Sequence, residues 1–524
     1  MKSTTPSLSR AETLVDVTSK KLSLTRKLVL LIMFCLAQFL DSFNNSALIS
    51  AIPALEVSMG MTESQSAWIL SAFQLTFSSF LLISGRISDV YNPKTAFIGG
   101  VSALGLISLG AGFVQDKIVI LTLRALMGIA SALTIPAALT LIVKVFPEPL
   151  EQARAIGVFG GCGAIANVIG ILIGALFVQY ASYHWVFWFV AIVAGPVSLA
   201  CIFLIPSQSN NTDGVDPSIA KWKKLDLIGV STLTVAIILF IFAITSGSTD
   251  GWGAAAVLAP LIISVLLVVC FFCWETITPA NKAAIPPRTW FLNNFSILFA
   301  VALLPFFWWS SVFMMFTTLW QSVDQWSVIS TAVHMLPLGI AGFIMSFTGS
   351  LSRVFSPKWI ILTGLSCMIV ATTLIALGGG NPDQYWPYIF PAFSIGSAGS
   401  MLVYSHTNIA IFQAAPASMA GTVGAVFNGA LQFGSAIGLA AINSIQTSVE
   451  ATHGGPDEYA GRAAAFWFIL GIVCLEALSI MWFYRTGADH QPQPSHISSV
   501  DNEKIDELNT KELSHDADLP SLPA

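Results

Sequence analysis

Two ten-residue stretches, GRISDVYNPK at residues 85–94 and GSLSRVFSPK at residues 349–358, are divergent copies of one pattern. Each copy follows one long apolar run and precedes another, and the second begins 264 residues after the first. Each is therefore expected to form a tight polar hairpin between two membrane-crossing helices. A repeat over this distance indicates that the chain consists of two related halves.

The composition is that of a membrane protein, because 55% of the 524 residues are apolar and only 10% are charged. Runs of about 20 apolar residues, enough to cross a bilayer as a helix, recur along most of the chain. Lipid cannot satisfy backbone hydrogen bonds, and the runs lack the alternation of barrel strands, so each crossing segment is expected to be helical. The sequence therefore predicts an all-α membrane protein.

Breaks at glycine, proline and charged residues divide the apolar runs into fourteen expected helices. They lie at residues 28–53, 66–84, 95–113, 118–143, 155–178, 185–205, 226–246, 254–275, 294–319, 328–348, 359–378, 386–411, 420–446 and 464–484. A second repeated pattern, GAIAN at 163–167 and GAVFN at 424–428, matches the fifth helix to the thirteenth. Together the two repeats predict a 6+2+6 arrangement, with two pseudo-symmetric six-helix halves and an inserted pair.

This arrangement divides the chain into seven parts. They are an N-terminal tail (1–27), the N-terminal six-helix half (28–205), a linker (206–225), the inserted helix pair (226–275), a second linker (276–293), the C-terminal six-helix half (294–484) and a disordered tail (485–524). With fourteen helices, 20 of the 23 Lys and Arg residues fall on one side, with Lys117 and Arg462 on the other and Arg124 inside the membrane. Positive residues collect in the cytoplasm, so both tails and both linkers are expected there.

The order of Gly85, Asp89 and Lys94 resembles the signature between the second and third helices of the major facilitator superfamily. The resemblance implies that the glycine permits close helix contact and that the carboxylate caps or pairs with a neighbouring helix end. It also implies that the loop controls switching between conformations. Arg353 replaces the acid in the second copy, so only the first half is expected to keep the carboxylate role.

The first helix carries Asp41 and closes with Ala-Ile-Pro at residues 51–53, which is similar to a pattern of the fourteen-helix drug:proton antiporter branch. An ionised carboxylate in hydrocarbon costs several kcal/mol, so Asp41 should face a cavity, pair or stay protonated. Arg124 resembles the Arg-x-x-x-Gly element of the superfamily's fourth helix. At ~1.5 Å per residue the two side chains lie at similar depths. We expect Asp41 to carry the proton and Arg124 to be its electrostatic partner, the alternative being a purely structural Asp41.

Small residues on the fifth helix recur at spacings of three and four, which puts them in one stripe suited to close helix packing. They are Gly160, Gly163, Asn167, Gly170 and Gly174. The stripe resembles the antiporter motif of this helix but lacks its Gly-Pro kink. The stretch 167–189 looks closest to the fungal aminotriazole-resistance branch, whose members export toxicants and some small inorganic solutes.

Three side chains in the second half are candidates to line a substrate cavity. Trp308 and Trp309 lie on the ninth expected helix, and His334 lies within the tenth. The alternative for the two tryptophans is contact with lipid or with other helices. For His334 it is a hydrogen-bonded packing role.

Together these features predict a proton-coupled secondary active transporter that exports small organic compounds, such as drugs, toxins or secondary metabolites, by alternating access. The alternatives are transport of a small inorganic solute such as ammonium or borate, and a membrane sensor that does not transport. The expected partners are a small-molecule substrate, protons and the lipid bilayer, with no nucleic acid, and the protein is expected to be a monomer.

The expected location is the plasma membrane, with the vacuolar membrane as the alternative. The sequence carries no metal-ligand cluster, no nucleophile and base pair and no phosphate-binding glycine loop. We therefore expect neither a metal nor a cofactor, and the protein is not predicted to be an enzyme or to be driven by ATP.

Overall fold

The computed structural model describes residues 23–486, except residues 62, 207–225, 280–282, 284, 379, 381, 417–418 and 456. The chain divides into two units, Met1–Tyr484 and Arg485–Ala524, and the helices lie in the first. Every regular element in the described part is helical, as the apolar runs predicted. The linker expected at 206–225 and the two tails lie almost wholly outside the described residues.

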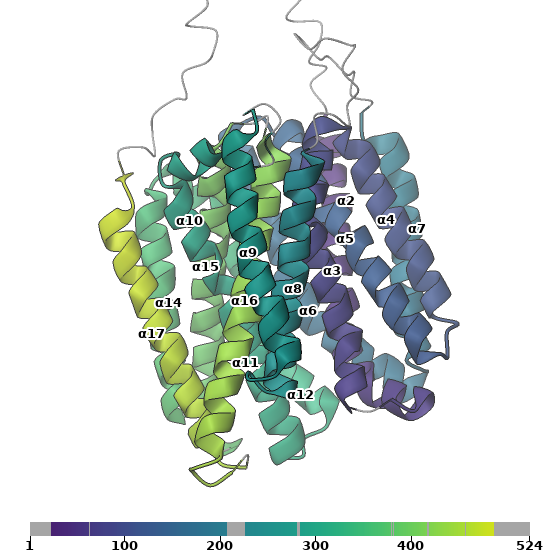
Figure 1. Cartoon of the computed structure of the whole chain (residues 1–524), viewed down its shortest axis with the longest axis vertical. Helices are drawn as coiled ribbons and strands as arrows, with labels where there is room; N and C mark the ends of the chain where they lie inside the picture. The colour runs from purple at the N-terminus through teal and green to yellow at the C-terminus, as the bar shows by residue number, and fades with distance from the viewer. Residues whose placement is uncertain are drawn as a thin grey trace, which may run out of the picture. The chain divides into compact units, whose positions relative to one another are not determined.

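The helices of the first half are α2 to α7, and the inserted pair follows them (Figure 1). Their bounds are α2 Leu24–Met59, α3 Glu63–Val90, α4 Pro93–Ala111, α5 Lys117–Val145, α6 Pro149–Tyr180, α7 His184–Leu204, α8 Leu227–Asp250 and α9 Ala255–Ile277. Within this half α2 packs on α6, α3 on α5, and α4 on both α5 and α7. Helices α8 and α9 pack against each other.

The second half contains α10 to α17 and several short helical turns. Its bounds are α10 Phe295–Ala302, α11 Leu304–Thr318, η3 Leu319–Val323, α12 Val328–His334, α13 Leu336–Met345, η4 Ser346–Arg353, α14 Pro357–Gly378, η6 Tyr385–Ile389, α15 Phe390–Ala414, α16 Ala420–Glu450 and α17 Ala460–Phe483. Helix α14 packs on α15 and α17, and α16 packs on α11 and α17.

Two of the predicted helices are each divided into two segments. Helix α11 begins at Leu304 immediately before Pro305, and α13 begins at Leu336 immediately before Pro337. Proline has no N–H to donate and is tolerated best in the first turn of a helix. Each proline therefore starts a new segment within a span that the apolar pattern predicted to be continuous.

Length and composition identify twelve described helices that can cross a membrane, fewer than the predicted fourteen. Helix α8 falls short because its apolar part is only Ile228–Ile244. Helix α15 is also not among the twelve, and it carries polar residues such as Ser400 and His406, both fully buried. By this measure the count of fourteen and the 6+2+6 arrangement are not supported.

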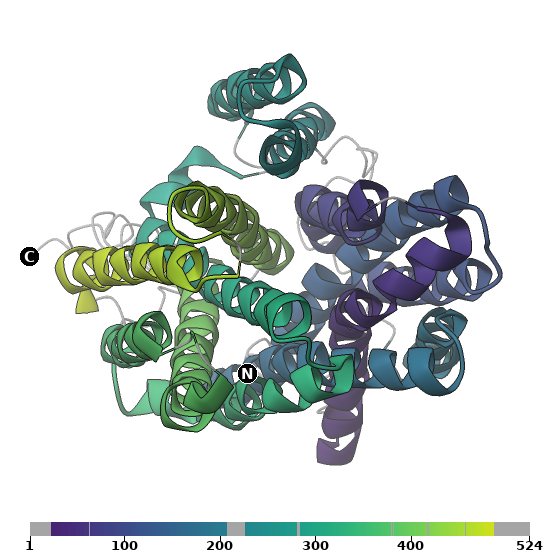
Figure 2. The ribbon, with the colours of Figure 1, turned by 90° about the horizontal axis from the view of Figure 1, so that it is seen from below.

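The two halves meet chiefly where α3 crosses α16 and where α6 packs against α13 and η4. Helix α8 contacts both α3 and α16, so the inserted pair lies beside one of the two boundaries between the halves (Figure 2). The Thr234 hydroxyl of α8 donates to the Ser79 carbonyl of α3 at 3.1 Å. The Trp252 indole, just beyond α8, donates to the Ser444 hydroxyl of α16 at 3.1 Å.

The repeated patterns make matching contacts in the two halves. The Lys94 ammonium donates to two carbonyls at the end of α7, at 2.8 and 2.6 Å, and Lys358 donates to two carbonyls at the end of α17, at 2.9 and 3.2 Å. The amide of Asn167 donates to the Gly163 carbonyl, as that of Asn428 does to Gly424. Positive groups are favourable at helix C-termini, so each lysine ties a helix end within its own half.

Candidate functional site

Asp41 is a buried carboxyl group on α2, with only 5% of its surface exposed. Its Oδ2 accepts a hydrogen bond of 2.5 Å from the Thr134 hydroxyl of α5, while Oδ1 has no hydrogen-bond partner in the described structure. A buried carboxylate without a counter-ion is costly, whereas the protonated acid is neutral. The environment of Asp41 therefore favours a group that can hold and release a proton.

Arg124 is fully buried on α5 and is surrounded by neutral groups. Its Nε donates to the Ile69 carbonyl at 2.8 Å, and its two terminal nitrogens donate to the amide oxygens of Asn44 at 3.1 Å and Asn45 at 3.4 Å. The guanidinium also lies 4.6 Å from the centre of the Phe73 ring. The fork of donors on arginine suits such a set of separate acceptors.

The structure does not join Asp41 directly to Arg124, which corrects the depth argument from sequence. On α5 Arg124 lies ten residues, about 15 Å, from Thr134, the partner of Asp41. Its side chain reaches Asn44, which is one helical turn beyond Asp41 on α2. Both helices extend past the predicted ends from which the two depths were counted.

Asp89 connects the two halves at the start of α16. Its carboxylate accepts from the Gly421 N–H at 2.7 Å, from the Thr422 N–H at 2.8 Å and from the Thr422 hydroxyl at 2.7 Å. A carboxylate is favourable at a helix N-terminus, where backbone N–H groups lack partners. This first-half carboxylate therefore caps a helix of the second half.

The same two helices cross so closely that neither Gly85 nor Gly421 has room for a side chain. A Cβ atom at Gly85 would lie 2.5 Å from the Gly421 carbonyl oxygen, and one at Gly421 would lie 2.5 Å from that of Gly85. The predicted hairpin is wrong in one respect, because Gly85 and Asp89 belong to the last turns of α3 and only Tyr91 and Asn92 form the connection. Lys94 belongs to α4 and binds α7 instead of this crossing.

The glycines of α6 lie against two different neighbours. Gly163, Gly170 and Gly174 face α2, where a Cβ would contact Gln38, Ser46 and Ala47 respectively. Gly160 instead faces the Tyr404 ring of α15 in the second half. Asn167 bonds within its own helix. Three of the five residues of the predicted stripe therefore lie in the contact between α2 and α6.

Of the three predicted cavity residues, Trp308 and Trp309 are neighbours on α11 that both lie against α15, whereas His334 lies in a different cluster. Trp308 is fully buried and donates to the Thr372 hydroxyl at 2.9 Å, in the contact between α11 and α14. Trp309 is half-buried and donates to the Ser397 hydroxyl at 3.1 Å, beside Tyr404.

His334 lies at the end of α12, in a separate cluster with Trp320, Trp326 and Tyr385. Its Nδ1 lies 2.8 Å from the Ser330 carbonyl oxygen, so this nitrogen carries a proton. Burial raises the pKa of Tyr385 to about 12, and its hydroxyl donates to the His334 carbonyl at 2.9 Å. The contacts of His334 thus favour the packing alternative.

Several polar residues that sequence reasoning passed over also lie between the helices. Asn45 donates to the Gln74 side-chain oxygen at 3.4 Å, and Gln74 donates to Gln432 of α16. Amides within apolar runs are unusual enough to have drawn attention to all three.

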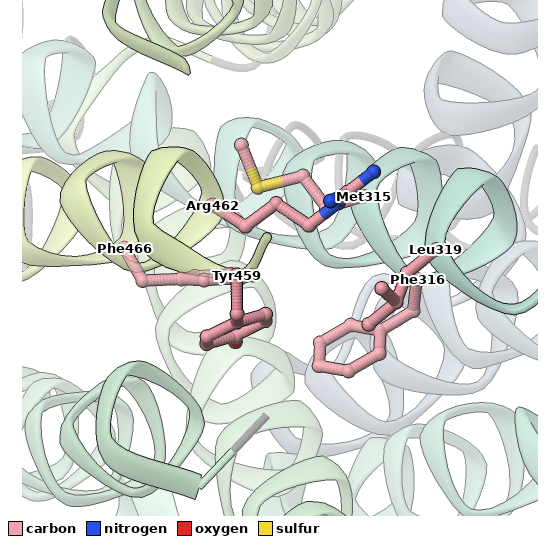
Figure 3. Close-up of a pocket in the computed structure, with 6 residues that line it drawn as sticks. All are labelled: Met315, Phe316, Leu319, Tyr459, Arg462 and Phe466. Atoms are coloured by element: carbon pink, nitrogen blue, oxygen red, sulfur yellow. The ribbon is translucent and has the colours of Figure 1, made fainter. Parts of the chain in front are cut away.

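A small hollow lies in the second half, between α11, η3 and α17 (Figure 3). It is lined by Met315, Phe316, Leu319, Tyr459, Arg462 and Phe466. None of the residues predicted from the sequence to act in proton coupling or substrate binding lines it. It is therefore separate from the contacts of Asp41 and Arg124.

Two sets of helices carry copies of the same patterns and meet at a crossing that the Asp89 carboxylate caps. This arrangement defines a membrane transporter fold. Residues 34–439 match the profile of the Major Facilitator Superfamily, and the chain belongs to this family. It is 27% identical to the major facilitator superfamily multidrug transporter mfsC of Aspergillus fumigatus over 90% of each chain. It is 28% identical to the puromycin resistance protein pur8 of Streptomyces alboniger over 81% of this chain and 82% of that protein.

A further relative is the low affinity ammonium transporter of Saccharomyces cerevisiae, 24% identical over 84% of each chain. Among solved structures, the human organic anion transporter MFSD10 superposes with a TM-score of 0.62 at 15% identity. The match covers 87% of this chain and 99% of that one. At this identity the similarity concerns the fold.

Proposed function

We propose that this protein is a proton-coupled secondary active transporter that exports small organic compounds by alternating access. The observation that carries proton coupling is Asp41, an acid buried among neutral groups on a candidate membrane helix. Losing its proton would leave an uncompensated charge, which a change in helix packing or hydration can relieve. Arg124 donates to Asn44, which lies one helical turn from Asp41 on α2. It is therefore the nearby cation that responds to that charge.

The contact between Asp89 and α16 supports alternating access. It consists of three hydrogen bonds that join the first half to the second, so it can break without unfolding either half. We propose that it holds this end of the protein closed and breaks when the halves separate there. By the distribution of lysine and arginine, this end is the cytoplasmic one.

Relatives named as a multidrug transporter and a puromycin resistance protein support organic compounds as substrates and export as the direction. We place the protein in the plasma membrane as a monomer, in the fourteen-helix drug:proton branch. Helices α8 and α15, which are 24 and 25 residues long, support fourteen crossings. At about 1.5 Å per residue each can span a core about 30 Å thick, and α15 can carry polar groups because protein surrounds it.

Labelling of a single cysteine tests the helix count. Gly253 lies in the turn between α8 and α9, where a Cβ meets no neighbour within 4 Å. In a variant without the native cysteines, Gly253→Cys should react with an impermeant maleimide added outside intact cells. Reaction only after permeabilisation would contradict fourteen crossings with cytoplasmic termini.

The main test measures efflux of labelled compounds from cells that express the protein, with and without a proton gradient. Asp41→Asn keeps the shape of the side chain but cannot lose a proton, so gradient-driven efflux should fall at least tenfold. Asp383→Asn, the same change at an exposed position, is the matched control and should behave as wild type. Full gradient-driven efflux by Asp41→Asn would refute the role of Asp41, and no transport by wild type would favour a sensor.

A second candidate function is transport of a small inorganic solute. The yeast relative named as an ammonium transporter favours it, and so does Ile171, which follows Gly170 where the export motif has proline. Uptake of methylammonium that is saturable and unaffected by organic compounds would favour this candidate over drug export.

A further inference from the structure

Side-chain hydrogen bonds form a continuous chain from the buried Arg124 to the opposite half of the protein. Arg124 donates to the Asn45 oxygen, Asn45 donates to the Gln74 oxygen, and Gln74 donates to the Gln432 oxygen. The first two distances are each 3.4 Å. The last bond passes from α3 to α16, so the chain crosses the boundary between the halves.

The chemistry of arginine fixes the direction of every bond in this chain. A guanidinium can only donate, so Asn45 must present its oxygen to Arg124 and its NH₂ group to the next residue. Gln74 must then accept through its oxygen and donate through its own NH₂ group. The order therefore does not depend on how the two ends of each amide are assigned. The positive charge at the start also polarises the bonds that follow.

The last bond lies on the boundary between α3 and α16, which the proposed alternating access requires to open. Gln74 and Gln432 are each eleven residues, about 16 Å, from the glycines at which α3 and α16 cross. Asn45 and Gln74 are half-buried, and Gln432 is 8% exposed. When α3 and α16 move apart, Gln74 loses its acceptor while Arg124 and Asn45 still hold its oxygen side.

We propose that the Gln74 NH₂ group is a substrate-binding site for carbonyl or ether oxygens, which replace Gln432 as its acceptor. The proposal rests on the transport function proposed above, and it adds that the transporter prefers substrates with such oxygens. A solute with acceptor oxygens fits this donor. A solute that offers only positive charge does not, because it has no atom that can accept a hydrogen bond from the NH₂ group.

Three variants separate this role from a structural one. Gln74→Glu keeps the length of the side chain and the acceptor for Asn45 but removes the N–H donors. Gln432→Leu removes the competing acceptor and leaves the Gln74 donor in place. Gln446→Leu is the matched control, because Gln446 lies on the same helix and bonds to Glu450 within it at 2.7 Å.

The experiment measures binding to the purified full-length protein with two probes, cycloheximide, which carries carbonyl oxygens, and tetraphenylphosphonium, which has none. Wild type should prefer cycloheximide. Gln74→Glu should lose about tenfold in cycloheximide affinity, as expected for one hydrogen bond in a buried site. Gln432→Leu should bind it at least as tightly as wild type, and Gln446→Leu should match wild type. Melting temperatures show that each variant is folded.

The outcomes distinguish the inference from the transport function. No preference of wild type for cycloheximide, or equal losses in Gln74→Glu and Gln432→Leu, would overturn the inference while efflux could still be intact. Binding with the expected pattern but without efflux from cells would support the site and contradict export.

Discussion

At the scale of single residues, Asp41 and Arg124 are both charged types held by neutral partners. Arg124 keeps its charge, and its burial is tolerable because a carbonyl, two amide oxygens and an aromatic ring replace water. Asp41 has one hydroxyl donor for two oxygens, so it is the less well satisfied of the two. The acid rather than the base is therefore the group whose charge is expected to change.

Asp89 and Asp116 allow a matched test of a carboxylate at a helix start. Asp116 caps its own helix, accepting from the Ile118 and Val119 N–H groups at 2.8 and 3.0 Å, whereas Asp89 caps a helix of the other half. Asp116→Ala should cost about 1 kcal/mol of stability and leave efflux near wild type. Asp89→Ala should reduce efflux at least tenfold, because the contact between the halves is lost.

Efflux is measured in cells that express each variant, and the melting temperature is measured on each purified variant. Equal loss of efflux in the two variants would mean that a missing cap, not a missing link between halves, explains the effect.

At the scale of elements, the crossing of α3 and α16 depends on the absence of side chains. Gly85 and Gly421 each lie where a Cβ would approach the other's carbonyl oxygen. The carboxylate of Asp89 is also 2.6 Å from the Cβ position at Gly421. Close packing and the carboxylate cap therefore occupy one place, and neither can be changed without the other.

Gly421→Ala should push the helices apart and weaken the cap, lowering both efflux and the melting temperature. Gly429, on the same helix, has nothing within 4 Å of its Cβ position. Gly429→Ala should therefore be neutral or stabilise by up to about 1 kcal/mol through helix propensity. Thermal unfolding and efflux assays compare the two variants. Wild-type efflux and melting temperature in Gly421→Ala would show that the crossing is not tight.

At the scale of the whole molecule, the halves touch at two related boundaries. One is the α3–α16 crossing, and the other brings η4 against α6, where Ser346 lies against Gly157 and Gly161. A Cβ at Gly349 would lie 2.6 Å from the Ala153 carbonyl oxygen. The two copies of the repeated pattern thus lie beside the two places where the halves meet.

Ser346→Cys tests whether the second boundary opens. Ser346 is fully buried in the described conformation, so a cysteine there should react slowly with a water-soluble maleimide. Reaction should become faster during proton-driven transport, whereas Ser322→Cys at an exposed position should react equally in both conditions. A reaction rate at position 346 that transport does not alter would mean that this contact stays closed.

Much of the fold could be predicted from the sequence, because apolar runs and repeated patterns report directly on helices and duplication. The breaks before Pro305 and Pro337 show the limit, since an apolar run continues through a helix interruption. The site was less predictable. Whether Arg124 meets Asp41 or Asn44 depends on helix rotation and on where each helix truly ends, which one-dimensional spacing does not fix.

The two lysines that end the repeated patterns make the same kind of contact in each half. Lys94 and Lys358 each bind the C-terminal end of the final helix of their own half. Asp89 is the fifth residue of the first pattern, and Arg353 stands at the equivalent place in the second. The lysine contact within a half is therefore present in both copies of the pattern, whereas the carboxylate contact between the halves is present only in the first.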